Sequence, residues 1–285
     1  MYKKIKSEIT QPDMILYSNI VYSNKFNDFL QTTIPLEVNI IRPFYQLRSW
    51  EKRPLLIWMS GGAFRNSTPM RNIPEMTEYA KQGFVVACIR YRTSSESVFP
   101  APLEDIKTAI RFLKYHHETY GIDPDKVIIA GHSAGAYLAI MAAVTGGTGL
   151  FETAEWNGCS STVNGAVSIS GGDMFLENVE TQVPGREINP LDLLMGCDLE
   201  KHPEKKRVAS AANYLSKDTA PILMIHGECD EMISIDGSKA FYERLISAGV
   251  RADFYEVEGE GHGSLGLRQP TIHKIVVDFI EDIFK

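Results

Sequence analysis

The stretch from residue 127 to residue 147 constrains the fold of this chain more than any other segment. It begins with the apolar run Val-Ile-Ile-Ala, passes through Gly-His-Ser-Ala-Gly at 131–135 and continues as an alanine-rich apolar segment. A short β-branched run bounded by glycine is typical of a strand that is covered on both faces, and the segment after it is typical of a helix. The pattern therefore predicts a strand that turns sharply into a helix through a serine.

The same alternation recurs along the chain after residue 30. The predicted strands are 34–40, 54–59, 84–89, 127–130, 166–169, 222–225 and 254–257, and the predicted helices are 72–82, 100–120, 134–147, 236–248 and 270–284. Strands that alternate with helices form a mostly parallel sheet, because a parallel connection has to cross over one face of the sheet. The sequence thus predicts an α/β fold with a mostly parallel central sheet and helices on both faces.

Residues 173–216 break this rhythm, because the segment is long, polar and irregular. We expect a short cap-like insertion near the carboxyl ends of the strands, within a single domain that spans 1–285. The apolar residues of the insertion either line an acyl or alcohol pocket or pack the insertion onto the sheet, and both interpretations stay open. These residues are Phe175, Leu176, Leu191, Leu193, Leu194 and Met195.

Composition excludes several classes of function. The chain has 285 residues and a formal net charge of −7, which argues against a surface for nucleic acid or for an anionic membrane. Its four cysteines are far apart and include no Cys-x-x-Cys pair, so they predict neither a disulfide framework nor a zinc site. We expect no metal and no organic cofactor.

The amino-terminal segment and the hydropathy pattern bear on location. Residues 1–19 contain no uninterrupted apolar region followed by a small-residue cleavage site, and no stretch is long enough to span a membrane. We therefore expect a cytoplasmic protein without a membrane span. A homodimer formed through an edge strand or the last helices is an open alternative to a monomer.

Residues 131–135 match the pattern Gly-x-Ser-x-Gly, placed between a predicted strand and a predicted helix as that motif requires. A tight turn brings the two flanking positions together, and glycine at both removes the Cβ atoms that would collide. The hydroxyl of Ser133 is then exposed above the sheet, next to the positive end of the helix that begins at Ala134. We predict that Ser133 is a nucleophile; the alternative is a glycine-rich turn with an incidental serine.

A serine hydroxyl needs a base that takes its proton, and histidine is the usual one. Of the seven histidines, His262 lies in the glycine-rich turn 259–263 directly after the last predicted strand, where functional groups of a parallel sheet collect. We predict that His262 is the base. The other histidines are assigned to surface positions or to local packing and hydrogen bonding: His116, His117, His132, His202, His226 and His273.

A carboxylate should orient the histidine and lie between serine and histidine in the chain. Asp230 follows the predicted strand 222–225 and fits this order, whereas Glu228 and Glu231 are interpreted as loop surface or as support for the site. The main rival is Asp173, which follows the preceding predicted strand, 166–169. Asp230 is favoured because both the chain order and the strand end fit.

A serine nucleophile also needs donors for the negative charge that develops on the carbonyl oxygen. Residues 60–64, Ser-Gly-Gly-Ala-Phe, follow the buried strand 54–59. Successive small residues let backbone N–H groups approach a ligand, so this loop and the N–H of Ala134 predict an oxyanion hole. The alternative is a plain tight turn.

Taken together, these motifs resemble the α/β-hydrolase fold, and specifically the bacterial esterases and lipases related to hormone-sensitive lipase and to the BD-FAE feruloyl and acetylxylan esterases. The resemblance covers about residues 55–265 and rests on four blocks in the family's order. The blocks are 60–64, 89–92 with 99–105, 131–135, and 226–230 with 261–263.

The resemblance implies a serine carboxylesterase that hydrolyses small or short-acyl esters, such as acetylated sugars or hydroxycinnamate esters, through an acyl-enzyme. It also implies that the oxyanion donors are the N–H groups of Gly62, Ala63 and Ala134, and that Asp105 has a structural role. This chain departs from the family's His-Gly-Gly-Gly, because Ser60 replaces the histidine and Ala63 the third glycine. The departure puts rate and substrate preference in doubt.

Two other functions stay open at this point. An amide hydrolase, either a peptidase or a formamidase, would use the same three side chains. A ligand-binding member of the fold with impaired catalysis is the further alternative, and only the altered loop at 60–64 favours it.

Overall fold

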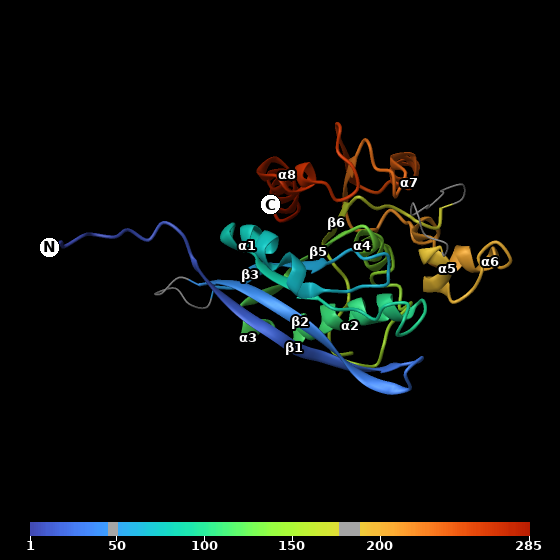
Figure 1. Ribbon diagram of the computed structural model, residues 1–285, viewed down its shortest axis with the longest axis horizontal. Helices are drawn as coiled ribbons and strands as arrows, with labels where there is room; N and C mark the ends of the chain where they lie inside the picture. Colours follow the sequence, from blue (N-terminus) through green and yellow to red (C-terminus); the bar gives the residue numbers. More distant parts are fainter. Residues whose placement is uncertain (45–50, 177–188) are drawn as a thin grey trace.

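The computed structural model describes residues 1–44, 51–176 and 189–285. One eight-stranded sheet runs through it in the order β1-β2-β4-β3-β5-β6-β7-β8 (Figure 1). The strands are β1 (Asp13–Asn27), β2 (Thr32–Phe44), β3 (Arg53–Met59), β4 (Val85–Ile89), β5 (Ile122–His132), β6 (Gly165–Ile169), β7 (Ile222–Gly227) and β8 (Ala252–Val257). From β4 to β8 neighbouring strands are parallel, whereas β1 pairs with β2 and β2 with β4 in antiparallel register.

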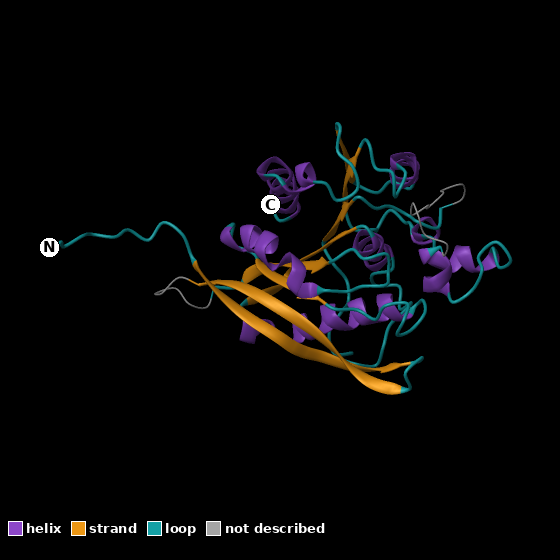
Figure 2. Ribbon diagram, in the orientation of Figure 1, coloured by secondary structure: helices purple, strands orange, loops and turns teal. Residues whose placement is uncertain are grey.

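Helices cover both faces of this sheet (Figure 2). The α-helices are α1 (Ile73–Lys81), α2 (Ala101–Tyr115), α3 (His117–Tyr120), α4 (Ala134–Val144), α5 (Pro190–Met195), α6 (Glu204–Ala209), α7 (Ile235–Ser247) and α8 (Pro270–Ile283). Short 3-10 helices lie at η1 (Pro69–Asn72), η2 (Ala211–Tyr214) and η3 (Leu265–Arg268). The predicted α/β fold with a mostly parallel sheet is confirmed.

Alternation along β3 explains why the sheet has a core on each face. Leu55, Ile57 and Met59 are buried in the cluster that includes α2, α4 and α7. Leu56 and Trp58 are buried in the cluster that includes α1 and α8. Successive strand residues point to opposite faces, so a strand covered on both sides has to be apolar throughout, as 54–59 is.

The first strand is a correction to the sequence analysis, which predicted no strand before residue 30. β1 is an edge strand whose residues are mostly exposed or half-buried, and the long hairpin that it forms with β2 lies at one side of the molecule (Figure 1). Its pairing register shifts between Tyr17 and Ile20, and Asn19 between them has a φ of 55°. This irregularity breaks the two-residue period that identifies a strand in sequence.

The predicted helix 100–120 is likewise two helices, because the chain leaves helical geometry at His116, between α2 and α3. Within 173–216, residues 177–188 lie outside the described residues, and the rest includes α5, α6 and η2. Phe175, Leu191, Leu194 and Met195 join the core on the side of α2 and α4. The division into one domain, 1–285, with an insertion at 173–216 stays a prediction.

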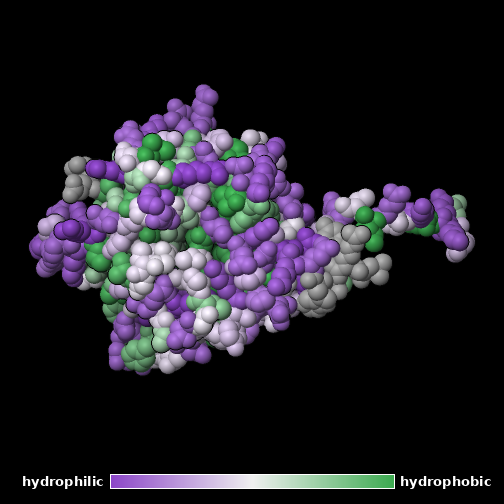
Figure 3. Space-filling model, turned by 180° about the vertical axis from the view of Figure 1, so that it is seen from behind, coloured by the Kyte–Doolittle hydropathy of each residue, from purple (hydrophilic) through white to green (hydrophobic). Residues whose placement is uncertain are grey.

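Two surface properties bear on function. On the face shown in Figure 3, hydrophilic side chains predominate and smaller hydrophobic areas lie between them. Among the residues that the structure describes, none of the helices has the length and apolar character needed to cross a membrane.

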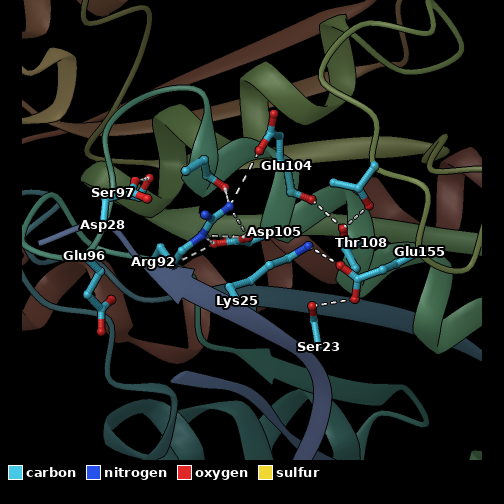
Figure 4. Close-up of polar contacts among 12 residues, drawn as sticks. Ser23, Lys25, Asp28, Arg92, Glu96, Ser97, Glu104, Asp105, Thr108 and Glu155 are labelled. Atoms are coloured by element: carbon cyan, nitrogen blue, oxygen red, sulfur yellow. Dashed lines mark hydrogen bonds and ion pairs between the residues drawn. The ribbon is translucent and has the colours of Figure 1, made fainter. Parts of the chain in front are cut away.

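A buried ion pair ties the start of α2 to the loop after β4 (Figure 4). Asp105 is fully buried and accepts hydrogen bonds from the backbone N–H of Arg92 at 2.9 Å and from its guanidinium Nη2 at 2.8 Å. Burial raises the pKa of Asp105, and the bonds from Arg92 oppose this only in part. Asp105 is thus a structural residue, as the resemblance implied.

Candidate active site

The turn between β5 and α4 places Ser133 at its tip, in a backbone conformation that non-glycine residues rarely adopt (φ 55°, ψ −120°). A Cβ on Gly131 would lie 2.4 Å from the backbone carbonyl of Gly135, and a Cβ on Gly135 would lie 2.3 Å from the carbonyl oxygen of Met59. Both distances are far below van der Waals contact. The glycines of the motif are therefore required by the close approach of β3, β5 and α4.

Gly131→Ala should consequently lower the free energy of unfolding by at least about 1–3 kcal/mol, the usual cost of overpacking, and should displace Ser133. The matched control is Gly158→Ala, because a Cβ at Gly158 meets nothing within 4 Å. Urea denaturation of both variants checks the prediction. A Gly131→Ala variant with the stability and the activity of the unmodified chain would contradict the described turn.

The structure brings together the three side chains that the sequence singles out. His262 Nε2 lies 3.0 Å from Ser133 Oγ, and His262 Nδ1 lies 2.8 Å from Asp230 Oδ2. Ser133 follows β5, Asp230 follows β7 and His262 follows β8. They meet because the carboxyl ends of these parallel strands lie at one edge of the sheet.

Asp173, the rival carboxylate, serves another purpose. It is buried and accepts hydrogen bonds from Ser210 Oγ at 2.6 Å, from Ala212 N at 2.9 Å and from Phe175 N at 3.0 Å. These bonds tie the end of β6 to the segment that contains η2. Glu228, a neighbour of Asp230, is exposed and accepts a hydrogen bond from Gly259 N at 2.9 Å.

Four polar groups contact the Asp230 carboxylate. Its Oδ1 accepts hydrogen bonds from the backbone N–H groups of Met232 and Ile233, each at 2.9 Å, and its Oδ2 faces both His262 and His226. Burial raises the pKa of Asp230, but the hydrogen bonds from His226, from His262 and from Ile233 outweigh burial, so that the pKa lies below its ordinary value of 3.8. The carboxylate is therefore ionised at neutral pH.

His226 is a residue of this site that the sequence analysis assigned only to local packing or hydrogen bonding. It is fully buried, with Nε2 at 3.1 Å from Asp230 Oδ2 and at 3.0 Å from the carbonyl oxygen of Ile233. Its Nδ1 lies 2.9 Å from Ser238 Oγ. The sequence points to this role only through position: His226 lies near the carboxyl end of β7, four residues before Asp230, which follows that strand.

The loop after β3 faces Ser133 across the same cavity. Its geometry is fixed by hydrogen bonds from Tyr91 Oη to the carbonyl of Ser60 at 2.9 Å and from Ser94 N to the carbonyl of Phe64 at 2.8 Å. Ser60 Oγ, which replaces the family's histidine, accepts a hydrogen bond from Thr68 N at 3.2 Å. Ser60 thus stabilises the loop that leads to the predicted oxyanion donors.

Gly62, Ala63 and Ala134, the predicted donors, all line the cavity beside Ser133. Ala63 has a φ of 51°, so this alanine holds a conformation in which glycine would be unstrained. Ala134 is the first residue of α4, and N–H groups in the first turn of a helix have no acceptor within that helix. The three predicted donor residues thus line the same cavity as Ser133, and their role as oxyanion donors stays a prediction.

The cavity has a volume of about 420 Å³ and two kinds of wall. On the side of the insertion it is lined by apolar residues: Met174, Pro190, Leu191, Met232 and Ile233. Elsewhere apolar lining residues are mixed with polar and charged ones. The apolar residues are Trp58, Phe64, Ile169 and Leu267, and the polar and charged residues include Asn66, Arg71, Asn72, Glu75, His132 and Arg268. Burial and the neighbouring His262 lower the pKa of His132 to about 3, so this imidazole is neutral at pH 7.

The fold is that of an α/β-hydrolase. A solved structure described as a truncated form of carbohydrate esterase from gut microbiota superposes with a TM-score of 0.81, at 25% identity, over 98% of this chain and 99% of that one. The apo form of Thermogutta terrifontis esterase 2 superposes with a TM-score of 0.74 at 21% identity, over 97% and 96% of the two chains. The latter likeness shows the fold.

Sequence comparison defines the family more closely. Residues 44–245 match the BD-FAE family, and the chain belongs to it. Esterase LipC of Mycobacterium tuberculosis (strain ATCC 25618 / H37Rv) is 29% identical over 79% of this chain and 57% of its own length. Esterase LipQ of the same strain is 28% identical over 81% and 55%. The chain therefore spans a little over half the length of these relatives.

Proposed function

We propose that this chain is a serine carboxylesterase that hydrolyses small or short-acyl esters through an acyl-enzyme on Ser133. The observation that carries the proposal is the hydrogen-bonded series Asp230–His262–Ser133, which opens into a cavity that Gly62, Ala63 and Ala134 also line. The names of the relatives, esterases LipC and LipQ, point to the same chemistry.

The proposed reaction has two steps. His262 Nε2 takes the hydroxyl proton while Ser133 Oγ attacks the ester carbonyl carbon, and the carbonyl oxygen becomes an oxyanion bound by the N–H groups of Gly62, Ala63 and Ala134. The C–O bond to the alcohol then breaks as His262 gives its proton to the departing oxygen, which leaves an acyl-enzyme. A water molecule then loses a proton to His262 and attacks the acyl carbon. The bond from Ser133 Oγ to the acyl carbon breaks as His262 returns that proton to Oγ, which releases the acid and restores the serine hydroxyl.

Asp230 supports both steps. Its ionised carboxylate accepts the Nδ1–H of His262, which fixes the tautomer whose Nε2 is free to act as a base, and it stabilises the imidazolium that forms. His226 holds Asp230 from its other side and is therefore a positioning residue. The strained turn at Ser133 keeps the hydroxyl above the sheet, within reach of His262.

Paired substrates distinguish an esterase from an amide hydrolase. We expect the purified chain to hydrolyse p-nitrophenyl acetate, and to hydrolyse p-nitroacetanilide, the matching amide, at less than about a hundredth of that rate, because the amide leaving group needs far more help from a general acid. Release of nitrophenol or nitroaniline is followed by absorbance. Comparable rates on both compounds would favour the amide hydrolase, and activity on neither would overturn the proposal.

The acyl chain and the natural alcohol are narrower questions. The apolar wall formed by Met174, Leu191 and Ile233 suits a short acyl group, and acetylated sugars and hydroxycinnamate esters are the proposed substrate classes. The cytoplasmic location stays a prediction from the sequence.

A further inference from the structure

Two arginines share the cavity with Ser133 and have no role in the reaction described above. Arg71 lies in η1, just after the loop that carries the oxyanion donors, and Arg268 ends η3, just after the turn that carries His262. Both side chains are exposed at the cavity. Within 1–44, 51–176 and 189–285, neither guanidinium forms an ion pair or a hydrogen bond.

Arg268 lies close to the reacting groups. A Cβ built on Gly263, the residue after His262, would lie 3.9 Å from Arg268 Nη2 and 3.0 Å from His132 Nε2. The rings of His132 and His262 are 5.0 Å apart. After burial and His262, the charges of Arg268 and Arg71 are further causes of the lowered pKa of His132.

The same cavity contains one opposing charge. The carboxylate of Glu75 also lines the cavity, where it accepts a hydrogen bond from Asn72 Nδ2 at 3.3 Å. With two guanidinium groups against one carboxylate, this wall carries net positive charge in a chain whose net charge is −7.

Unpaired arginines beside an active site are suited to carboxylate or phosphate, which guanidinium groups bind through paired hydrogen bonds. The leaving alcohol has to lie near His262, which protonates it, and Arg268 follows His262 by six residues in the same loop. The apolar wall on the side of the insertion is left for the acyl group.

We propose that the alcohol part of the ester substrate carries an anionic group, a carboxylate or a phosphate, which Arg71 and Arg268 bind. This inference rests on the proposed esterase activity and adds the class of alcohol.

The test compares 4-acetoxybenzoate with its neutral methyl ester, methyl 4-acetoxybenzoate. The ratio of their kcat/KM values is measured for the unmodified chain and for the double variant Arg71→Gln/Arg268→Gln, so that the intrinsic reactivity of the two esters cancels. We expect the double variant to lower the ratio about 10- to 100-fold, mainly through the KM of the anionic ester. The variant Arg207→Gln/Arg244→Gln removes the same charge from α6 and α7, away from the cavity, and should leave the ratio within about twofold, as exposed distant charges are screened.

Two further esters identify the anion and its place. Comparison of 4-acetoxyphenyl phosphate with 4-acetoxybenzoate shows for which of the two esters the double variant lowers kcat/KM more. A loss of kcat/KM for either ester, relative to the neutral ester, supports the proposal. Mono-(4-methylphenyl) succinate carries its charge on the acyl side. The proposal is overturned if the substitutions at Arg71 and Arg268 lower kcat/KM for the succinate alone. It is also overturned if they change the ratio of kcat/KM for the anionic and neutral esters no more than the control substitutions at Arg207 and Arg244 do.

A binding measurement separates this inference from the proposed function. Ser133→Ala, with and without the two arginine substitutions, is titrated with 4-hydroxybenzoate by calorimetry. If the unmodified chain hydrolyses no ester but the arginine substitutions weaken binding about tenfold or more, the anion site stands and the proposed function fails. Equal binding by both proteins overturns the anion site, whether or not the chain is an esterase.

Discussion

We expect Ser133→Ala to lower kcat for an unactivated ester such as ethyl acetate by about 10⁵- to 10⁶-fold, because removal of the nucleophile forces any residual reaction to use direct attack by water. The proposed oxyanion donors and the cavity should survive in this variant, so binding of the ester should change little. Alanine keeps the Cβ of serine in the same backbone conformation, and we expect the variant to fold. The rate of hydrolysis is measured in a pH-stat from the acid released, and circular dichroism checks that the variant is folded.

Ser160→Ala is the matched control for this substitution. Ser160 is exposed and does not line the cavity, so the control should retain the full rate. A folded Ser133→Ala protein that keeps more than about a hundredth of the unmodified rate would contradict the acyl-enzyme mechanism, since loss of a serine nucleophile costs orders of magnitude more.

Asp230→Asn should lower kcat about 10⁴-fold while the fold is retained. The asparagine amide can donate a hydrogen bond to Nδ1 of His262 and so favour the tautomer whose Nε2 carries the proton, which is the wrong tautomer for a base. Because the pKa of Asp230 is lowered, its carboxylate stays ionised well into the acid range, and kcat/KM should not fall through protonation of Asp230 at mildly acidic pH. Steady-state rates between pH 4 and pH 9 test both statements.

Asp173→Asn is the informative comparison, because Asp173 and Asp230 follow neighbouring strands. Asp173 binds Ser210, Ala212 and Phe175, so its substitution should lower the melting temperature and leave kcat of the folded fraction close to that of the unmodified chain. If Asp173→Asn lost the rate and Asp230→Asn kept it, the assignment of the carboxylate would be wrong.

The features that the sequence predicted well are those that depend on local geometry. The strands β3, β4, β6 and β7 and the end of β5 are evident because a sheet covered on both faces requires nearly continuous apolar runs, whereas β2 is evident from alternating apolar and polar residues. The turn at Ser133 is evident because close packing forces glycine at 131 and 135. β1 could not be recognised, since its exposure at the sheet edge and its irregular register remove the signal.

Residues that act through long-range contacts were beyond sequence reasoning. The role of His226 depends on the folding of the loop after β7 back onto the end of that strand, which brings Asp230 to His226 Nε2. Arg71 and Arg268 are almost two hundred residues apart in the chain and share a cavity only because the loops after β3 and β8 meet above β5. Single surface arginines carry no pattern that would single them out.

Covalent labelling shows whether Ser133 is the activated nucleophile. The purified chain is treated with a fluorophosphonate, which reacts with serine hydroxyls that a neighbouring base has activated, and the modified residue is identified by peptide mass mapping. We expect a single adduct on Ser133, which Ser133→Ala abolishes and whose formation His262→Ala slows severely. Failure of the folded chain to react, or an adduct on another residue, would contradict this expectation.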